Sequence, residues 1–144
     1  MKFIKINDFE FYVYIFSIKY SRENLIEDVK GILKKIQKIL RLKGFYKVNV
    51  SLKSVGLFLK VVRLEDSFYK NTLDFKIEID NDLDIYYKTN NYYLVCFSSF
   101  VYYYDGMFYV LVDESFDKIY EKVEFGDFVF GNDILDCLNK AIIV

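Results

Sequence analysis

The stretch VYYYDGMFYVLV (residues 101–112) sets two apolar runs on either side of one Asp-Gly step. Asp105 and Gly106 are the pair that a two-residue type I′ hairpin favours, because both central positions of that turn need a positive φ. The predicted pairs are Tyr104–Met107, Tyr102–Tyr109 and Phe100–Leu111 on one face, and Tyr103–Phe108 and Val101–Val110 on the other. Both faces are apolar, so we expect a central hairpin covered on each side, with most of its rings in the core.

The composition limits the kinds of protein that the chain can be. Its 144 residues suffice for one domain or two small ones, and 53% hydrophobic with 20% aromatic residues can bury a sizeable core. The sequence has no His, which removes the commonest general base and metal ligand. We therefore expect a protein that is not an enzyme and that uses no cofactor or metal.

Charged residues interrupt every apolar run before it reaches the roughly 18 residues of a membrane span. The opening residues, MKFIKINDFEF, also carry charges where a signal peptide has its apolar region. We expect a cytoplasmic protein without membrane contact. Cys96 and Cys137 stand in apolar surroundings, which favours buried thiols over a disulfide.

One helix between two hairpins is predicted in residues 1–65. Ser21 has the position of an N-cap and Gly44 ends the helix. Apolar residues recur at three- and four-residue spacing, which gives the helix one apolar face. They are Leu25, Ile26, Val29, Ile32, Leu33, Ile36, Ile39 and Leu40. The strands are predicted at residues 2–6, 9–16, 45–53 and 57–61. This order predicts an antiparallel sheet covered by one helix.

The charge changes sign near residues 64–71, which is the best candidate for a linker. Residues 1–63 hold 14 Lys and Arg against 5 Asp and Glu, whereas residues 64–144 hold 6 against 16. We therefore predict a basic unit at 1–65 and an acidic unit at 66–144. The expected fold class is α+β, with two small antiparallel-sheet units that are each covered by one or two helices. The opposite charges mark partner surfaces of opposite sign, or two halves that face each other.

The acidic half contains further predicted elements beside the hairpin. Residues 73–79 alternate as a strand. Residues 85–98 fit either a helix up to residue 90 followed by a strand at 93–97, or a hairpin about Asn90 and Asn91. Residues 118–130 favour strands, and Asn132 is expected to cap a terminal helix. The apolar residues of that helix are Ile134, Leu135, Leu138 and Ile142.

The residues suggest three kinds of function. The helix at 22–43 carries a basic surface that could bind nucleic acid, although such a face is also common as a solvated one. Its residues are Lys30, Lys34, Lys38 and Arg41. The motif DNDLD at 80–84 lacks the glycine and the later glutamate of a calcium loop. Protein recognition needs no special residue and suits rigid aromatic sheets of opposite charge.

The order of motifs resembles the MecA-type adaptor proteins. MKFIKINDFEFYVYIF, SRENL and YKVNVSLKSVGLFLKVV are similar to the N-terminal domain of that family. YYYDGMFYVLV is similar to its tyrosine-rich hairpin, and VEFGDFVFGNDILDCLNK to its closing strand and helix. The chain differs in having a short linker and a basic N-terminal unit, so the likeness is to a short, diverged member.

The resemblance implies a non-enzymatic adaptor. The N-terminal unit would hold a substrate protein, and the C-terminal unit would dock on a ClpC-type AAA+ unfoldase for regulated proteolysis. The docking residues that it implies are Asp105, Gly106, Glu121, Glu124 and Gly126. Two readings stay open: the glycines could serve backbone geometry while the acids are solvated, and the chain could be a small nucleic-acid-binding regulator that uses the basic helix.

Overall fold

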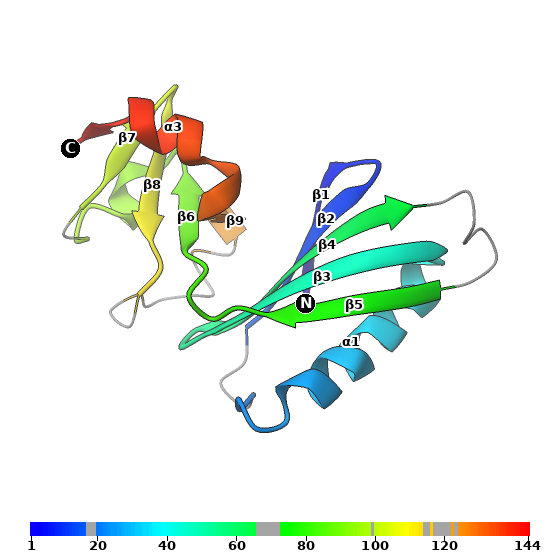
Figure 1. Cartoon of the computed structure of the whole chain (residues 1–144). Helices are drawn as coiled ribbons and strands as arrows, with labels where there is room; N and C mark the ends of the chain where they lie inside the picture. The colour runs from blue at the N-terminus through cyan, green and yellow to red at the C-terminus, as the bar shows by residue number, and fades with distance from the viewer. Residues whose placement is uncertain (17–19, 66–72, 99, 114–115, 117–121, 123) are drawn as a thin grey trace. The chain divides into compact units, whose positions relative to one another are not determined.

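The structure is a computed structural model of the chain, and it describes residues 1–16, 20–65, 73–98, 100–113, 116, 122 and 124–144 (Figure 1). The chain forms two compact units, which we call the first unit (Met1–Asn81) and the second unit (Asp82–Val144). Each unit contains a five-stranded sheet. The predicted α+β class with two small sheets is therefore confirmed.

The sheet of the first unit has the strand order β1-β2-β4-β3-β5. Its elements are β1 (Lys2–Asn7), β2 (Glu10–Ile15), α1 (Leu25–Leu40), β3 (Gly44–Lys53), β4 (Gly56–Glu65) and β5 (Leu73–Ile79). The first four strands pair antiparallel, and β5 runs parallel to β3. The strand-strand-helix-strand-strand order predicted for residues 1–65 is present.

The boundary between the units lies after Asn81, and not at residue 65 as the charge pattern predicted. The strand β5 pairs with β3 from Gly44↔Leu73 to Val50↔Ile79, so it belongs to the first sheet. Asn81 then fastens the chain to β3, because its Oδ1 accepts from the Leu52 N–H at 2.8 Å and its carbonyl accepts from Lys53 Nζ at 2.8 Å. Most of the predicted linker at 64–71 lies outside the described residues.

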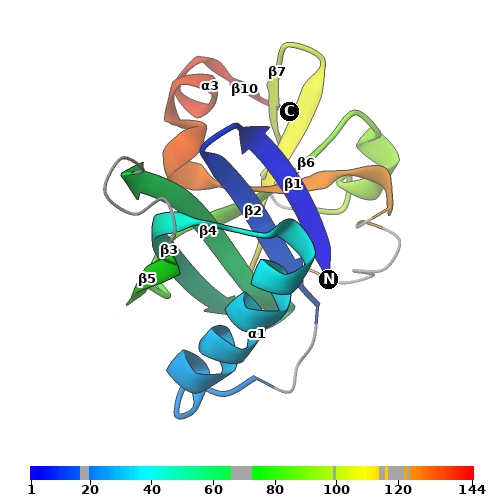
Figure 2. The same cartoon turned by 90° about the vertical axis from the view of Figure 1, so that its right-hand side faces the viewer.

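The helix α1 lies across one face of the first sheet and forms the core with it (Figure 2). Five residues of the predicted apolar stripe are buried: Leu25, Val29, Ile32, Leu33 and Ile36. They pack against Val13, Tyr46, Val48, Val50, Leu57, Leu59 and Val61 of the strands. Ile26, Ile39 and Leu40 are exposed instead, so the stripe is narrower than its apolar pattern predicted.

Both ends of α1 differ from the prediction. The helix begins after Asn24 rather than after Ser21. It ends at Arg41, which has φ 52° and donates its N–H to the Gln37 carbonyl at 2.8 Å. The left-handed residue that closes a helix is thus an arginine here. Gly44 begins β3 instead.

Gly31 is a place where the helix can be strengthened. It is exposed within α1, and a Cβ built on it meets no atom within 4 Å. Glycine costs about 0.5–1 kcal/mol relative to alanine inside a helix, because it loses more backbone freedom on folding. We expect Gly31→Ala to raise the free energy of unfolding of the first unit by that amount. Urea unfolding followed by circular dichroism would measure it, and a lower midpoint would contradict the helical placement.

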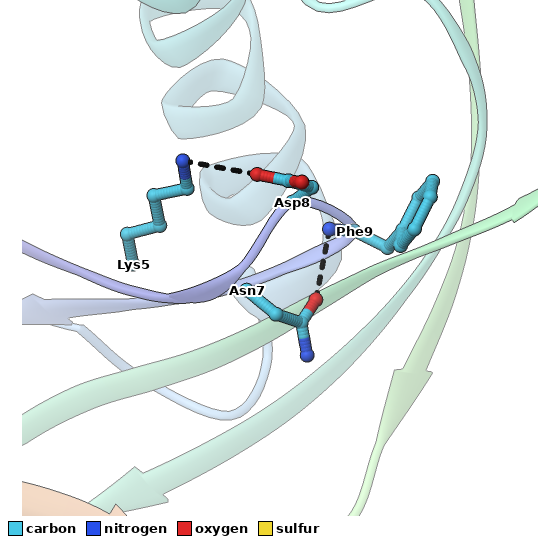
Figure 3. Close-up of polar contacts among 4 residues, drawn as sticks. All are labelled: Lys5, Asn7, Asp8 and Phe9. Atoms are coloured by element: carbon cyan, nitrogen blue, oxygen red, sulfur yellow. Dashed lines mark hydrogen bonds and ion pairs between the residues drawn. The ribbon is translucent and has the colours of Figure 1, made fainter.

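The hairpin of β1 and β2 turns at Asp8 and Phe9, one residue later than predicted. Asn7 Oδ1 accepts from the Phe9 N–H at 2.8 Å, and Lys5 Nζ lies 3.2 Å from Asp8 Oδ1 (Figure 3). The amide closes a local side-chain turn of the kind that Asn favours. The ion pair is solvent-exposed and adds at most about 1 kcal/mol. These contacts fix the turn of an edge hairpin.

The sheet of the second unit has the order β10-β7-β8-β6-β9 and pairs antiparallel throughout (Figure 1). Its strands are β6 (Ile85–Thr89), β7 (Tyr102–Tyr104), β8 (Met107–Leu111), β9 (Asp127–Phe130) and β10 (Ile142–Ile143). Its short helices are η1 (Tyr92–Leu94), η2 (Gly131–Asp133) and α3 (Leu135–Lys140). Each segment is therefore brief, and the sheet provides most of the regular structure.

The hairpin of β7 and β8 has the predicted turn. Asp105 has φ 51° and Gly106 has φ 80°, as a type I′ turn requires. The pairs Tyr104–Met107, Tyr103–Phe108 and Tyr102–Tyr109 are present. The two further pairs are not: β7 begins at Tyr102, and the Val101 carbonyl accepts from the Val144 N–H at 2.8 Å. On its other edge, β8 pairs with β6, which makes it a central strand.

Each face of this hairpin contains a buried residue, Tyr109 on one and Val110 on the other. The helix α3 packs against β7, and the Tyr92 ring lies 5.3 Å from the Phe108 ring. Burial of the rings is less complete than expected. Tyr109 is buried, whereas Phe108 and the three tyrosines of β7 are half-buried.

The remaining predictions for this unit are corrected in part. Residues 85–89 form a strand and 92–94 a short 3₁₀ helix, so neither alternative for 85–98 is right in full. Asn132 lies in η2, the residue before α3 is Ile134, and Ile142 belongs to β10. Of the strand-rich region 118–130, the described part contains β9, whereas residues 118–121 and 123 lie outside it.

Candidate functional site

The register of the second sheet brings four of the predicted docking residues to one end of it. Lys88 pairs with both Asp127 and Tyr109, and Thr89 pairs with Phe108. The segment before Asp127 and the β7–β8 turn therefore extend beyond the sheet at the end where β6 finishes. We call this the turn end of the second sheet. Asp105, Gly106 and Glu124 are exposed there, Gly126 is half-buried, and Glu121 lies outside the described residues.

The two glycines at the turn end have structural reasons to be glycine. A Cβ on Gly126 would lie 2.5 Å from both Cζ and Oη of Tyr87 and 2.6 Å from the Lys88 carbonyl oxygen. Gly106 has open space around it but a positive φ. A positive φ therefore accounts for Gly106, and the close approach of Tyr87 and of the Lys88 carbonyl accounts for Gly126. A partner at this end would contact the acids and their neighbours.

A cluster of three rings, of which Tyr87 and Phe128 are buried and Phe116 is half-buried, supports the turn end. The rings of Tyr87, Phe116 and Phe128 lie 5.2–5.7 Å apart. Tyr87 Oη donates to the Lys122 carbonyl at 2.6 Å, and Lys122 Nζ lies 4.2 Å from the centre of the Phe116 ring. Lys122 is therefore held by its backbone and by a cation–π contact. The chain leading to Gly126 is fastened to the sheet.

A chain of hydrogen bonds centred on Thr89 joins two segments of the turn end. The buried Thr89 hydroxyl donates to the Phe125 carbonyl at 2.9 Å and accepts from the Asn91 N–H at 3.1 Å. Asn91 Oδ1 then accepts from the Tyr93 N–H at 3.1 Å. Tyr93 and Phe125 are thus connected through three hydrogen bonds. An Asn before two tyrosines is the one sequence signal of this turn, because Asn side chains cap such N–H groups.

Aromatic side chains of these two segments, and of the turn that follows η1, are exposed to solvent. The exposed fraction is 84% for Tyr93, 94% for Phe97 and 53% for Phe125, and Tyr92 is also exposed. We call Tyr92, Tyr93, Phe97 and Phe125 the aromatic rim. Sequence reasoning missed it, because a run such as YYLVCF looks like core when its path is unknown. Grouped apolar exposure of this kind is typical of an interaction surface.

Acidic side chains lie at the same end of the second sheet as Tyr93 and Phe125. Glu124 and Asp127 flank Phe125 in sequence, and Asp105 occupies the neighbouring hairpin turn; all three are exposed. Residues 82–144 contain 11 Asp and Glu against 4 Lys. Two lysines are described at this end: Lys88 Nζ lies 5.8 Å from the centre of the Tyr109 ring, and Lys122 Nζ lies 4.2 Å from the centre of the Phe116 ring. The turn end therefore presents rings within a negative field.

Tyr86 in β6 and Tyr109 in β8 add no negative charge to the turn end. Burial raises the pKa of Tyr109 above its ordinary value, and Cys137 and Asp105 raise it further. Burial, followed by the nearby Asp84, likewise raises the pKa of Tyr86. A phenol with a raised pKa stays protonated at neutral pH. Both side chains are therefore neutral hydroxyls.

The predicted basic surface of the first unit is present as an exposed stripe on α1. Lys30, Lys34, Lys38 and Arg41 are all exposed, and their three- and four-residue spacing places them on one side of the helix. That side is opposite the buried face. The pair of Lys30 with Glu27, at 3.7 Å, is solvent-exposed and weak. We call these four residues the basic stripe.

Other candidate chemistry has limited support. Among the described residues, no three His, Cys, Asp or Glu side chains are grouped so as to hold a metal ion. Cys96 and Cys137 are free thiols in half-exposed positions, so the prediction that they are buried is wrong. Cys96 Sγ donates to the Tyr93 carbonyl at 3.6 Å.

Within the part of the chain that the structure describes, the helices are too short or too polar to cross a membrane.

Comparison with known proteins gives no relative: no protein-family model, curated protein or solved structure matches the chain.

Proposed function

We propose that the chain is a non-enzymatic cytoplasmic adaptor that binds a substrate protein through its first unit and docks on a ClpC-type AAA+ unfoldase through its second. The resemblance of the sequence motifs to MecA-type adaptors suggests these partners. The observation that carries the proposal is the turn end of the second sheet, where the acids Asp105 and Glu124 and the ring of Phe125 are all exposed. Such a surface suits protein recognition and needs no catalytic group.

Two physical properties support docking through the turn end. Rings on a fixed backbone lose little conformational entropy when they are buried, so they can act as anchors in an interface. The acids around them speed the encounter with a positively charged partner and discriminate against wrong ones. The opposite signs of the two units let each select a different partner. This division of labour is what an adaptor requires.

Stimulation of ATP hydrolysis by a purified ClpC-type unfoldase tests the proposal directly. We expect the chain to bind the unfoldase and raise its ATPase rate. The double variant Asp105→Asn and Glu124→Gln should weaken docking about tenfold, because removing charges at the edge of an interface slows association. Asn is chosen since it tolerates the positive φ of the turn. Asp8→Asn, in the exposed turn of the first unit, is the matched control and should bind like the wild type.

No interaction with the unfoldase at concentrations on the order of tens of micromolar would contradict the proposal, since weaker docking than this would not assemble a working complex.

A nucleic-acid-binding regulator is the second candidate, and the exposure of the basic stripe favours it. Affinity for DNA or RNA should fall steeply with salt, by a log–log slope of about −0.9 for each phosphate neutralised. Neutralising Lys34, Lys38 and Arg41 to glutamine should reduce both the affinity and that slope. Lys5→Gln, an exposed lysine of β1, serves as the control. Filter binding at several salt concentrations measures both quantities, and salt-independent or absent binding would remove this candidate.

A further inference from the structure

The aromatic rim contains the most exposed large hydrophobic side chains of the described residues. Tyr93 and Phe97 leave 84% and 94% of their surfaces in water, although each could bury a large area. They follow one another within a short run of turns after β6, and Phe125 is joined to the same run through Thr89. Isolated exposed rings are ordinary, but a group on one short segment is not.

The backbone beneath the rings is held in place. Successive turns are closed by hydrogen bonds from Leu94 N to Asn91 O at 3.1 Å, from Val95 N to Tyr92 O at 3.0 Å and from Ser98 N to Val95 O at 3.0 Å. The Val95 side chain is buried. The segment is thus anchored on its inner side while its rings face solvent. A surface that is already ordered pays less entropy when a partner covers it.

The charges around the rim decide which chemistry fits it. Glu124 is exposed beside Phe125, and Asp105 is exposed in the β7–β8 turn at the same end of the sheet. A nucleic acid or an anionic lipid surface would be repelled by this negative field. Lys and Arg are attracted both to the carboxylates and to the faces of the rings. Apolar side chains between such cations would cover the remaining ring surface.

We propose that the aromatic rim binds a protein segment in which Lys or Arg alternates with apolar side chains. The inference rests on the proposed function in that it takes the second unit to be a protein-binding unit, and it adds the surface and the chemistry of the partner. Tyr93 and Phe97 supply the apolar contact, and Glu124 with Asp105 supplies the charge that selects cations. The negative charge would disfavour an acidic segment, and the exposed rings would disfavour a purely polar one.

Fluorescence anisotropy with two short labelled peptides, used with the full chain, tests this inference. One peptide alternates arginine and leucine, and the other alternates glutamate and leucine. We expect saturable binding of the first, weakened by salt, and none of the second. The double variant Tyr93→Ala and Phe97→Ala should reduce affinity at least about tenfold, as the loss of interface anchors does. Glu124→Gln should weaken binding and its dependence on salt.

Phe100→Ala is the matched control, because Phe100 is an exposed ring that precedes β7 and so lies away from the turn end. It should bind like the wild type. Equal binding by the Tyr93 and Phe97 double variant, or equal binding of the glutamate peptide, would overturn the inference. So would sedimentation showing that the rings hold a second copy of the chain. A chain that binds the arginine peptide yet fails to stimulate the unfoldase would refute the proposed function alone.

Discussion

Phe128→Ala is expected to lower the free energy of unfolding of the second unit by about 3–5 kcal/mol, because it leaves a cavity in the middle of a ring cluster. Phe128 is fully buried, and its ring lies 5.2 Å from Tyr87 and 5.7 Å from Phe116. The hydrophobic core of a unit of this size supplies about 3–5 kcal/mol of stability, so the substitution removes most of it. We therefore expect amide hydrogen exchange, followed by mass spectrometry, to show loss of protection throughout residues 82–144.

Phe108→Ala is the comparison that makes this prediction sharp. Phe108 is half-buried, and the centre of its ring lies 5.3 Å from the centre of the Tyr92 ring and 5.0 Å from that of Tyr103. Its loss should cost less, about 1–2 kcal/mol, since part of its surface is already in water. Sequence pattern placed Phe108 in the core. If both variants lost protection equally, the division between buried and half-buried rings would be wrong.

Gly56→Ala should destabilise the first unit by about 3 kcal/mol or more. A Cβ at this position would overlap the carbonyl oxygen of Ile15 and would lie 3.0 Å from the Phe16 Cα, and these are backbone atoms of a paired strand that cannot turn aside. Overpacking costs about 1–3 kcal/mol. The backbone also has φ 152°, a conformation that residues with a side chain rarely adopt, at a cost of about 1–3 kcal/mol. Urea unfolding of the full chain would measure the loss.

Gly106→Ala is the control for the Gly56 prediction. Gly106 also has a positive φ, but a Cβ there meets open space. Only the backbone term applies, so we expect a loss of about 1 kcal/mol in the second unit. A Gly56 variant no less stable than the Gly106 variant would show that β2 can move away from β4.

Local patterns predicted those parts of the fold that depend on neighbouring residues. The Asp105-Gly106 turn carries its own geometry, and the register of the hairpin follows from it. Alternation and helical spacing likewise located the elements of the first 65 residues. Alternation also predicted the strand at 73–79, but it could not name the partner strand. The parallel pairing of β5 with β3 joins residues that are distant in sequence, which is why the unit boundary was misplaced.

The candidate site divides in the same way. The turn at Asp105 and Gly106 was predictable because its geometry depends on these two neighbouring residues, whereas their docking role comes from the resemblance and stays a prediction. The exposure of Tyr93 and Phe97 depends on the path of the chain after β6, and hydrophobicity alone cannot tell an outward ring from a buried one. Gly126 was singled out through a resemblance, and its close approach to Tyr87 is a contact between separate strands. Sequence spacing contains no record of such an approach.

The parallel strand β5 has a consequence for the synthesis of the chain and for the behaviour of its fragments. Until residues 73–79 have been synthesised, the outer edge of β3 carries open N–H and C=O groups from Gly44 to Val50. Open edges of this kind recruit other strands, so the nascent chain is most prone to aggregate in that interval. A fragment ending at residue 65, where the charge changes sign, would keep that edge open permanently. A fragment ending after Asn81 closes it.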